Sequence, residues 1–184
     1  MHIFKDAIYE NKVVFHYKLP LSDVKPFRES ALFENKIYFS MEEIPQREIF
    51  LILHEFGPEK IDSFEMRFGI GFKMVASYLA EELASFCFFS DFPFKFRFFY
   101  LPHEAIYFFD CFTFENFRGL GAVHSEVAYV IDKYSAYGFK EANVEIESSN
   151  TSSIKAFSKI GFEKTEEYHY TRFLFFKRVK EVIL

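Results

Sequence analysis

The chain has 184 residues, half of them apolar, and its formal net charge is −5. A chain of this length and apolar content is most simply one domain with a sizeable core, and we expect residues 1–184 to form it. The negative charge argues against binding of nucleic acid through a basic face, and no apolar run is long enough to span a bilayer.

Taken in chain order, the sequence alternates between strand patterns and helix patterns. Runs rich in β-branched and aromatic residues predict strands at residues 12–19, 36–40, 72–80, 83–90, 105–113, 142–147, 162–165 and 168–178. The aromatic segment 94–101 lies between two prolines and is either an insertion or a long irregular edge strand. The pattern predicts an α/β chain, in which helices flank both faces of a mixed sheet.

The helix patterns lie between these strands. Two short helices are expected after Pro45 and Pro58, because proline is tolerated in the first turn of a helix. A longer amphipathic helix is expected from Ala122 to Tyr137, with Val123 on its apolar face. A last short helix, 153–160, follows a cluster of serine, asparagine and threonine that offers N-cap oxygens.

Cysteine content and the first residues bear on the compartment. Cys87 and Cys111 form no CxxC pair and predict no disulfide framework, which fits a reducing compartment. The first residues are charged and lack the apolar stretch of a signal peptide. We therefore expect a cytoplasmic protein. The 29 phenylalanines have two interpretations: base composition of the genome, which we favour, or a surface for lipid or a long acyl chain.

The stretch from Asp110 to Val123, DCFTFENFRGLGAV, joins the end of an expected strand to the start of an expected helix. Glycines at 119 and 121 let the backbone approach a ligand closely. The first amides of a helix have no partner inside the helix, and the helix dipole adds partial positive charge there. This loop therefore predicts an anion site, most often for phosphate.

A second stretch, Asn150 to Phe162 (NTSSIKAFSKIGF), lies downstream of this loop. Together the two resemble the GNAT N-acetyltransferase superfamily, in which the acetyl-CoA loop R-G-x-G-x-G/A precedes N-x-x-S-x-x-x-Y-x-x-x-G-F. The resemblance covers roughly residues 72–184 and implies the GNAT acyl-CoA N-acyltransferase fold. Two positions depart from the pattern: Val123 replaces the last glycine or alanine, and Phe157 replaces the tyrosine.

The resemblance also implies that two parts of the chain have different roles. Residues 1–71 would supply N-terminal strands and the variable helices beside the acceptor, and residues 72–184 would form the acetyl-CoA-binding core. The cofactor-binding positions that it implies are Cys111, Phe112, Thr113, Arg118, Gly119, Leu120, Gly121, Ala122, Val123, Asn150, Ser153 and Phe157. Backbone groups of the first three would pair with the pantetheine arm.

The implied activity is transfer of an acetyl group from acetyl-CoA to a primary amine by direct attack. Asp110 is the first candidate for the base, and Glu115 and Glu147 come after it. Phe157 stands where the family's tyrosine usually protonates the departing thiolate, so catalytic activity is uncertain. The histidines form no HExxH or H-x-H pattern, and no metal is expected.

Two other functions stay open beside this one. The departures at Val123 and Phe157 motivate a catalytically weak protein that binds acyl-CoA as a sensor or scaffold. The phenylalanine excess motivates an N-acyltransferase for longer acyl chains. The expected partner is a small-molecule amine or an amine of a protein, and nucleic acid is not expected. The oligomeric state, a homodimer included, is left open.

Overall fold

The structure is a computed structural model that describes residues 9–23, 32–96, 99–173 and 176–183. Its main sheet has eight strands in the order β10-β9-β1-β8-β7-β4-β3-β2. These strands are β1 (Tyr9–Pro20), β2 (Glu34–Tyr38), β3 (Lys73–Leu79), β4 (Glu82–Ser90), β7 (Ala105–Thr113), β8 (Glu141–Glu147), β9 (Glu163–Phe173) and β10 (Phe176–Ile183). Among the described strands, β7 and β8 form the one parallel pair of this sheet.

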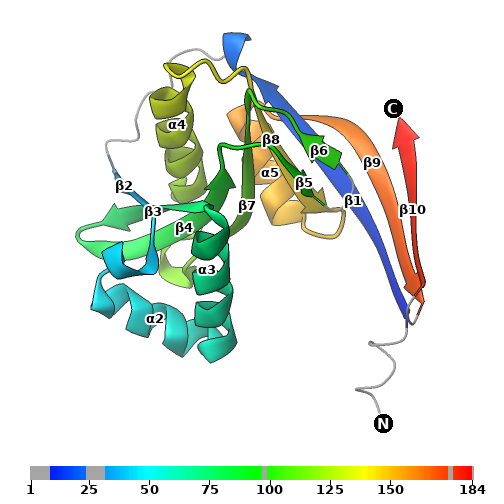
Figure 1. Cartoon of the computed structure of the whole chain (residues 1–184). Coiled ribbons are helices and arrows are strands. Elements are labelled where there is room, and N and C mark those ends of the chain that lie inside the picture. Colours follow the sequence, from blue (N-terminus) through cyan, green and yellow to red (C-terminus); the bar gives the residue numbers. More distant parts are fainter. Residues whose placement is uncertain (1–8, 24–31, 97–98, 174–175, 184) are drawn as a thin grey trace.

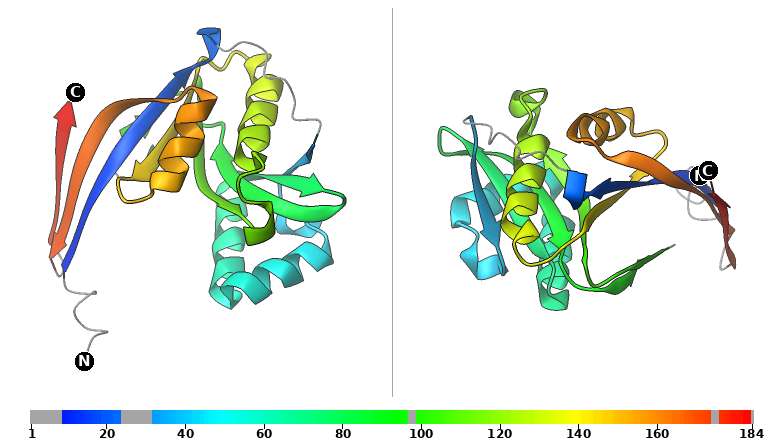
Figure 2. Two further views of the ribbon diagram at one scale, coloured as in Figure 1. Left: turned by 180° about the vertical axis from the view of Figure 1, so that it is seen from behind. Right: turned by 90° about the horizontal axis from the view of Figure 1, so that it is seen from above.

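Helices cover both faces of the sheet, as the pattern predicts. Helices α4 (Ala122–Ser135) and α5 (Thr151–Ile160) lie on one face. Helices α2 (Gln46–Phe56) and α3 (Pro58–Ile70) lie on the other (Figures 1 and 2). The chain is therefore an α/β protein with a mixed sheet between two helical layers.

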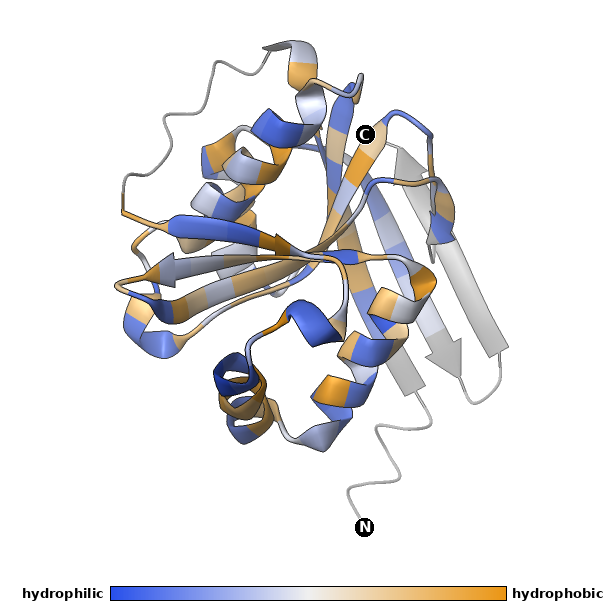
Figure 3. Ribbon diagram, turned by 60° about the vertical axis from the view of Figure 1, so that its left-hand side comes forward, coloured by the Kyte–Doolittle hydropathy of each residue, from blue (hydrophilic) through white to orange (hydrophobic). Residues whose placement is uncertain are grey.

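Amphipathic helices and alternating strands build a separate core on each face. Under α4 and α5 the core includes Phe89, Phe108 and Val127, all fully buried. Under α2 and α3 it includes Phe64, whose ring contacts Phe88 edge-on at 4.7 Å between centroids. Figure 3 shows hydrophobic and hydrophilic residues on the same helices, as amphipathic packing requires. Much of the phenylalanine excess therefore fills these two cores.

Several predicted boundaries are wrong in detail. The expected helix to Tyr137 ends at Ser135. The two last expected strands are instead β9, which runs without a break from Glu163 to Phe173, and β10. Long pairing of β9 with β1 keeps the chain extended through Glu166 and Glu167, which lie between the two expected strands. Segment 94–101 is not one long irregular edge strand, because its described residues form two short antiparallel strands, β5 (Phe94–Phe96) and β6 (Phe99–Leu101).

The expectation about the cysteines is also wrong. Cys87 on β4 and Cys111 on β7 are joined in a disulfide. They lie far apart in the sequence but on neighbouring antiparallel strands, so sequence spacing alone does not reveal the pair. Within the described residues, no helix has the length and apolar character needed to cross a membrane.

Candidate functional site

Strands β7 and β8 separate part of the way along their length. They pair from Ala105↔Glu141 to Phe108↔Val144, and both strands continue beyond the last pair. On its other side β7 stays paired with β4, but Phe86 faces Phe112 while Phe88 faces Phe109. Cys87 therefore faces two residues, which is the pattern of a β-bulge. Beyond Phe108, β7 presents an edge that β8 does not pair with.

A cavity of about 810 Å³ lies beside this edge. The end of β7, the loop that follows it, the first turn of α4 and one face of α5 surround the cavity. Of the cofactor-binding residues predicted from the sequence, every one except Leu120 lines it. The fold thus brings together two motifs that are separate in the sequence.

The glycine loop has the backbone shape that its sequence predicts. Gly119 and Gly121 have φ values of +80° and +89°, a region that favours glycine. The space where a Cβ would stand at either position holds no atom within 4 Å, so the loop backbone is open to a ligand. Arg118 Nε donates to the Thr113 carbonyl oxygen over 3.3 Å and ties the loop to the end of β7. Leu120 is exposed and is not among the residues that line the cavity.

Helix α5 forms the opposite wall. The Asn150 side chain caps it, because Oδ1 accepts from the Ser153 backbone N–H at 3.1 Å. Phe157 is 2% exposed, lines the cavity and packs edge-on against Phe162 at 5.2 Å between centroids. Its ring offers no proton at this position. Val123 also lines the cavity and is partly packed against the core, so its side chain is shared between the two.

A buried polar group lies behind the cavity wall. Glu126 on α4 is fully buried, and burial is the main cause that raises the pKa of its carboxyl well above the ordinary value. The neighbouring Ser77 and Ser85 lower this pKa in part, but neither carboxyl oxygen of Glu126 has a hydrogen-bond partner among the described residues, so burial dominates. Ser85 Oγ also donates to the Phe112 carbonyl oxygen over 2.8 Å and lies 3.2 Å from Thr113 Oγ1. The same buried polar cluster therefore touches two residues of the cavity wall.

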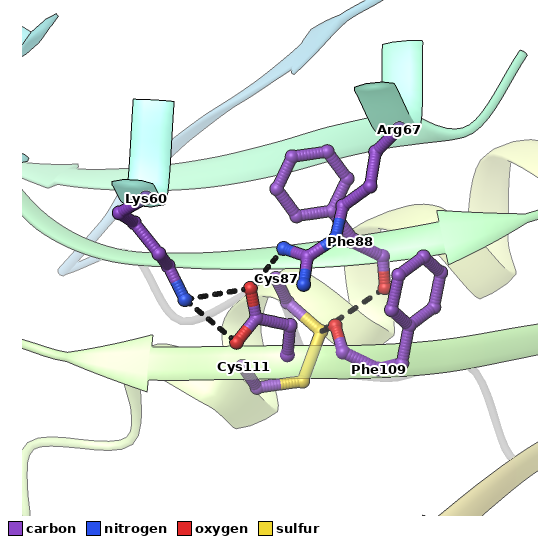
Figure 4. Close-up of polar contacts among 7 residues, drawn as sticks. Lys60, Arg67, Cys87, Phe88, Phe109 and Cys111 are labelled. Atoms are coloured by element: carbon purple, nitrogen blue, oxygen red, sulfur yellow. Dashed lines mark hydrogen bonds and ion pairs between the residues drawn. A yellow bond between two sulfur atoms is a disulfide. The ribbon is translucent and has the colours of Figure 1, made fainter. Parts of the chain in front are cut away.

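The carboxylate of Asp110 is held by two cations from α3. Lys60 Nζ lies 2.9 and 2.8 Å from its two oxygens, and the Arg67 guanidinium pairs with it as well. Figure 4 shows Lys60 and Arg67 reaching from α3 toward β7, next to the disulfide. The cations also stand over phenylalanine rings, Lys60 over Phe56 at 5.0 Å and Arg67 over Phe88 at 4.9 Å. Asp110 is partly buried and is not among the residues that line the cavity.

The other candidate carboxylates lie elsewhere. Glu115 is exposed in the 3-10 turn η3 (Glu115–Phe117) and does not line the cavity. Glu147 accepts a 2.7 Å hydrogen bond from Lys12 Nζ at the exposed end of β8. The structure therefore does not gather the three carboxylates at one point. No group of three or more possible metal ligands occurs in the part of the chain that the structure describes.

Sequence reasoning missed two lysines of the cavity wall. Lys155 and Lys159 line it from α5, together with Ser152 and Ala156. Their spacing places them on the helix face that carries Ser152, which is the signal that could have found them. Lysines on a short helix are usually solvated, so the pattern alone gave no reason to choose them.

Neither a family model nor a curated protein sequence matches the chain. Solved structures do match its fold. The tandem GNAT protein of the clavulanic acid biosynthesis pathway matches with a TM-score of 0.63 and 15% identity, over 90% of this chain and 54% of that one. A GNAT-family acetyltransferase from Novosphingobium aromaticivorans gives 0.57 and 12%, over 86% and 62%. A GCN5-related N-acetyltransferase-like protein from Streptococcus suis gives 0.54 and 15%, over 94% and 65%.

The chain spans 54% to 65% of the length of these three structures. At identities this low, the structural matches establish a shared fold and nothing finer. The chain has the fold of the GNAT N-acetyltransferases, as its two motifs predict.

Proposed function

We propose that this GNAT-fold protein is an N-acyltransferase that carries an acetyl group from acetyl-CoA to a primary amine. One observation supports this above the others. The residues that the resemblance implies for the donor, drawn from two distant motifs, line one cavity at the point where β7 and β8 part. A fold alone would not require that convergence, because a single fold hosts many functions.

The donor fits the cavity by its chemistry. The amides of the loop from Gly119 to Gly121 and of the first turn of α4 suit the diphosphate of CoA. The unpaired edge of β7 at Cys111, Phe112 and Thr113 suits the amides of the pantetheine arm, which would add to the sheet as a further strand does. The thioester would then lie near the bulge in β7.

In the reaction, the neutral amine nitrogen attacks the thioester carbon. A bond from nitrogen to carbon forms, the carbonyl oxygen takes up negative charge, and the bond from carbon to sulfur then breaks. A backbone N–H on the free edge of β7 would stabilise the oxygen, as preorganised donors do in acyl transfer. The proton lost by the nitrogen passes to the thiolate or to solvent.

The proposed reaction must take a proton from the amine and give one to the thiolate. Asp110 is engaged by Lys60 and Arg67 and does not line the cavity, and exposed Glu115 would have to act through water. An amine that loses its proton to solvent needs neither. Phe157 cannot protonate the thiolate, but a thiol with a pKa of about 8.5 is a tolerable leaving group. Water in the cavity would supply that proton.

A second function is favoured by the same phenylalanine. A protein that binds acyl-CoA as a sensor would need the cavity but no acid, and Phe157 fills the acid's position in the cavity wall. The use of longer acyl chains has less support, because phenylalanines such as Phe64, Phe86 and Phe88 pack in the core instead of forming a surface. The acceptor, a small molecule or a protein amine, would decide between enzyme and sensor.

A calorimetric titration and a turnover assay test this proposal together. We expect acetyl-CoA to bind more tightly than a long-chain acyl-CoA, and we expect free CoA thiol to appear when an amine from a panel of small amines and peptides is added. Binding of acetyl-CoA without thiol release from any amine would favour the sensor. A preference for the long-chain donor would favour the longer-chain transferase, and no binding of any thioester would refute all three.

A further inference from the structure

Lys60, Arg67 and Asp110 form an ionic cluster that lies outside the cavity. The two cations reach from α3 to the one carboxylate of Asp110, and no other acid among the described residues pairs with either of them. The cluster therefore carries one positive charge in excess, in a chain whose net charge is −5. Its three side chains are 18%, 19% and 26% exposed, so each can be reached from solvent.

The cluster lies where β7 leaves β8. Asp110 comes two residues after Phe108, which is the last residue of β7 that pairs with β8. Its φ value of +50° belongs to the bulge, and the residue that follows it is Cys111, near which we place the thioester of the donor. Consecutive Cα atoms are about 3.8 Å apart, so the cluster lies beside the proposed position of the reacting carbonyl.

The donor cavity and the cluster belong to opposite faces of the sheet. The first turn of α4 and one face of α5 bound the cavity, whereas the two cations come from α3 on the other face (Figure 2). Phe112 connects the two sides, because it lines the cavity and its ring meets Phe56 of α2 at 4.6 Å between centroids. Lys60 stands over that same Phe56 ring. An amine that attacks while the donor fills the cavity would therefore come from the side of Lys60 and Arg67.

The excess charge decides which amines suit this side. Excess positive charge repels a plain ammonium ion and attracts a carboxylate. Ammonium and guanidinium groups form charge-assisted hydrogen bonds with carboxylates, and these bonds are stronger where apolar groups exclude part of the water. Arg67 stands over Phe88 at 4.9 Å and over Phe109 at 5.6 Å, and Lys60 stands over Phe56 at 5.0 Å. The cluster thus suits an acceptor that carries its own negative charge.

We propose that Lys60 and Arg67 bind a carboxylate of the acceptor, and that the acceptor is an α-amino acid. This inference rests on the proposed function, since it names the acceptor class of the same reaction. The acceptor carboxylate would be the second anion shared by the two cations, beside Asp110, and would balance their charge. A carboxylate held there lies next to the thioester position, so few bonds can separate it from the attacking amine. In an α-amino acid the two groups share one carbon.

The protein should then prefer a free amino acid to the amide of the same amino acid, which keeps the amine and lacks the negative charge. A neighbouring carboxylate raises the pKa of an ammonium group, so at about pH 7.5 the amide has more of the neutral amine. A preference for the acid would therefore not come from the amine itself. One partly exposed charge-assisted contact predicts a kcat/KM about tenfold higher for the acid. The difference should lie mainly in KM, because this contact forms in the ground state and persists in the transition state.

Steady-state release of CoA thiol at saturating acetyl-CoA, with a panel of α-amino acids and their amides, tests the proposal. Arg67→Gln removes the excess charge and leaves Lys60 to pair with Asp110, so the preference should fall to less than about twofold. Arg67→Lys keeps the charge and should retain a preference of about threefold or more. The control Lys133→Gln, at an exposed position of α4, should keep the full preference. Circular dichroism and urea midpoints would show that each variant is folded.

Three results would overturn the acceptor class and leave the N-acyltransferase in place. One is a wild type that uses amides or plain amines as well as the amino acids. The second is a preference for the acid that persists in folded Arg67→Gln, and the third is an equal loss of acids and amides in that variant. A wild type that binds acetyl-CoA and releases no thiol with any acceptor would instead refute the transferase, and this inference with it.

Discussion

Phe157 decides how the proposed reaction would end. Its ring is buried at 2% exposure, and it reaches the cavity that we assign to the donor. A tyrosine at this position would place a hydroxyl where the ring now meets the cavity. A positioned general acid contributes about 10²–10⁴-fold to a rate, so its absence is a large effect if protonation of the thiolate limits the reaction.

The substitution Phe157→Tyr should therefore raise the rate of CoA release by about tenfold or more at saturating donor, because it adds an acid and keeps the ring. Phe157→Leu, which keeps an apolar side chain without adding an acid, should not raise it. The measurement is steady-state release of free thiol with an active amine. An unchanged rate for Phe157→Tyr would mean that water already supplies the proton or that another step limits turnover.

Asp110 joins α3 to β7 through charge. Its φ value of +50° lies in a region that asparagine also tolerates, so Asp110→Asn removes the charge and leaves the backbone preference in place. Lys60 and Arg67, both partly buried, would then lack an anion. Removing one partner of such a group leaves uncompensated charge, and partial exposure reduces the cost.

We expect Asp110→Asn to lower the free energy of unfolding by about 1–2 kcal/mol in urea titrations at neutral pH. The matched control is Glu147→Gln, which breaks the exposed pair with Lys12 and should cost less than about 0.5 kcal/mol. Equal effects of the two substitutions would show that the contact of α3 with β7 does not depend on this charge.

Helix α4 carries an acid in its buried face. Glu126 is fully buried, and its pKa is raised well above the value of 4.5 that a free glutamate has, chiefly by desolvation. At a pH below the ordinary value of 4.5, both the folded and the unfolded states bind the proton, so Glu126 does not change the free energy of unfolding with pH. As the pH rises above it, the unfolded state releases the proton and the folded state keeps it, so stability falls. The loss continues until the pH reaches the raised folded-state pKa.

The substitution Glu126→Gln removes this pH dependence, because glutamine does not titrate. Relative to the wild type, the variant should gain about 1 kcal/mol or more in unfolding free energy between pH 5 and pH 8. Urea titrations at the two pH values measure this difference. Glu65→Gln on the exposed side of α3 is the control, and it should show no such gain. A wild type whose stability relative to Glu126→Gln is the same at both pH values would contradict a buried neutral acid.

Most elements could be predicted from the sequence, because short-range chemistry sets them. Pro58 opens α3, and Gly71 closes it in the left-handed conformation. The glycine loop and the Asn150 cap also lie where the sequence predicts them. Strand β9 runs on because its pairing with β1 decided positions that local propensity left balanced. Helix α4 ends early in a turn, in which the N–H groups of Tyr137 and Gly138 donate to the carbonyl oxygens of Tyr134 and Ser135.

The candidate site could be predicted only in part. Its donor side came from two motifs of a known family, whereas its partners across the fold did not. Lys60 and Arg67 are 50 and 43 residues from Asp110, so no local pattern connects them. The disulfide of Cys87 and Cys111 likewise depends on how β4 pairs with β7. Sequence spacing does not reveal contacts between segments that are distant along the chain.

In the whole molecule, the main sheet has two roles. Its two faces bury separate cores under α4 and α5 and under α2 and α3. In the middle of the sheet, strands β7 and β8 separate next to a cavity with cationic walls. Arg118, Lys155 and Lys159 line this cavity and no aspartate or glutamate does, in a chain whose net charge is −5, so an anionic donor would gather there.

Hydrogen–deuterium exchange with and without acetyl-CoA shows whether the donor occupies this cavity, because the method reports on backbone amides one segment at a time. We expect saturating acetyl-CoA to slow exchange in the loop and first turn from Gly119 to Val123, at the free edge of β7 from Cys111 to Thr113, and at the start of α5. Unchanged exchange in all three segments at saturating acetyl-CoA, or protection confined to other parts of the chain, would contradict it.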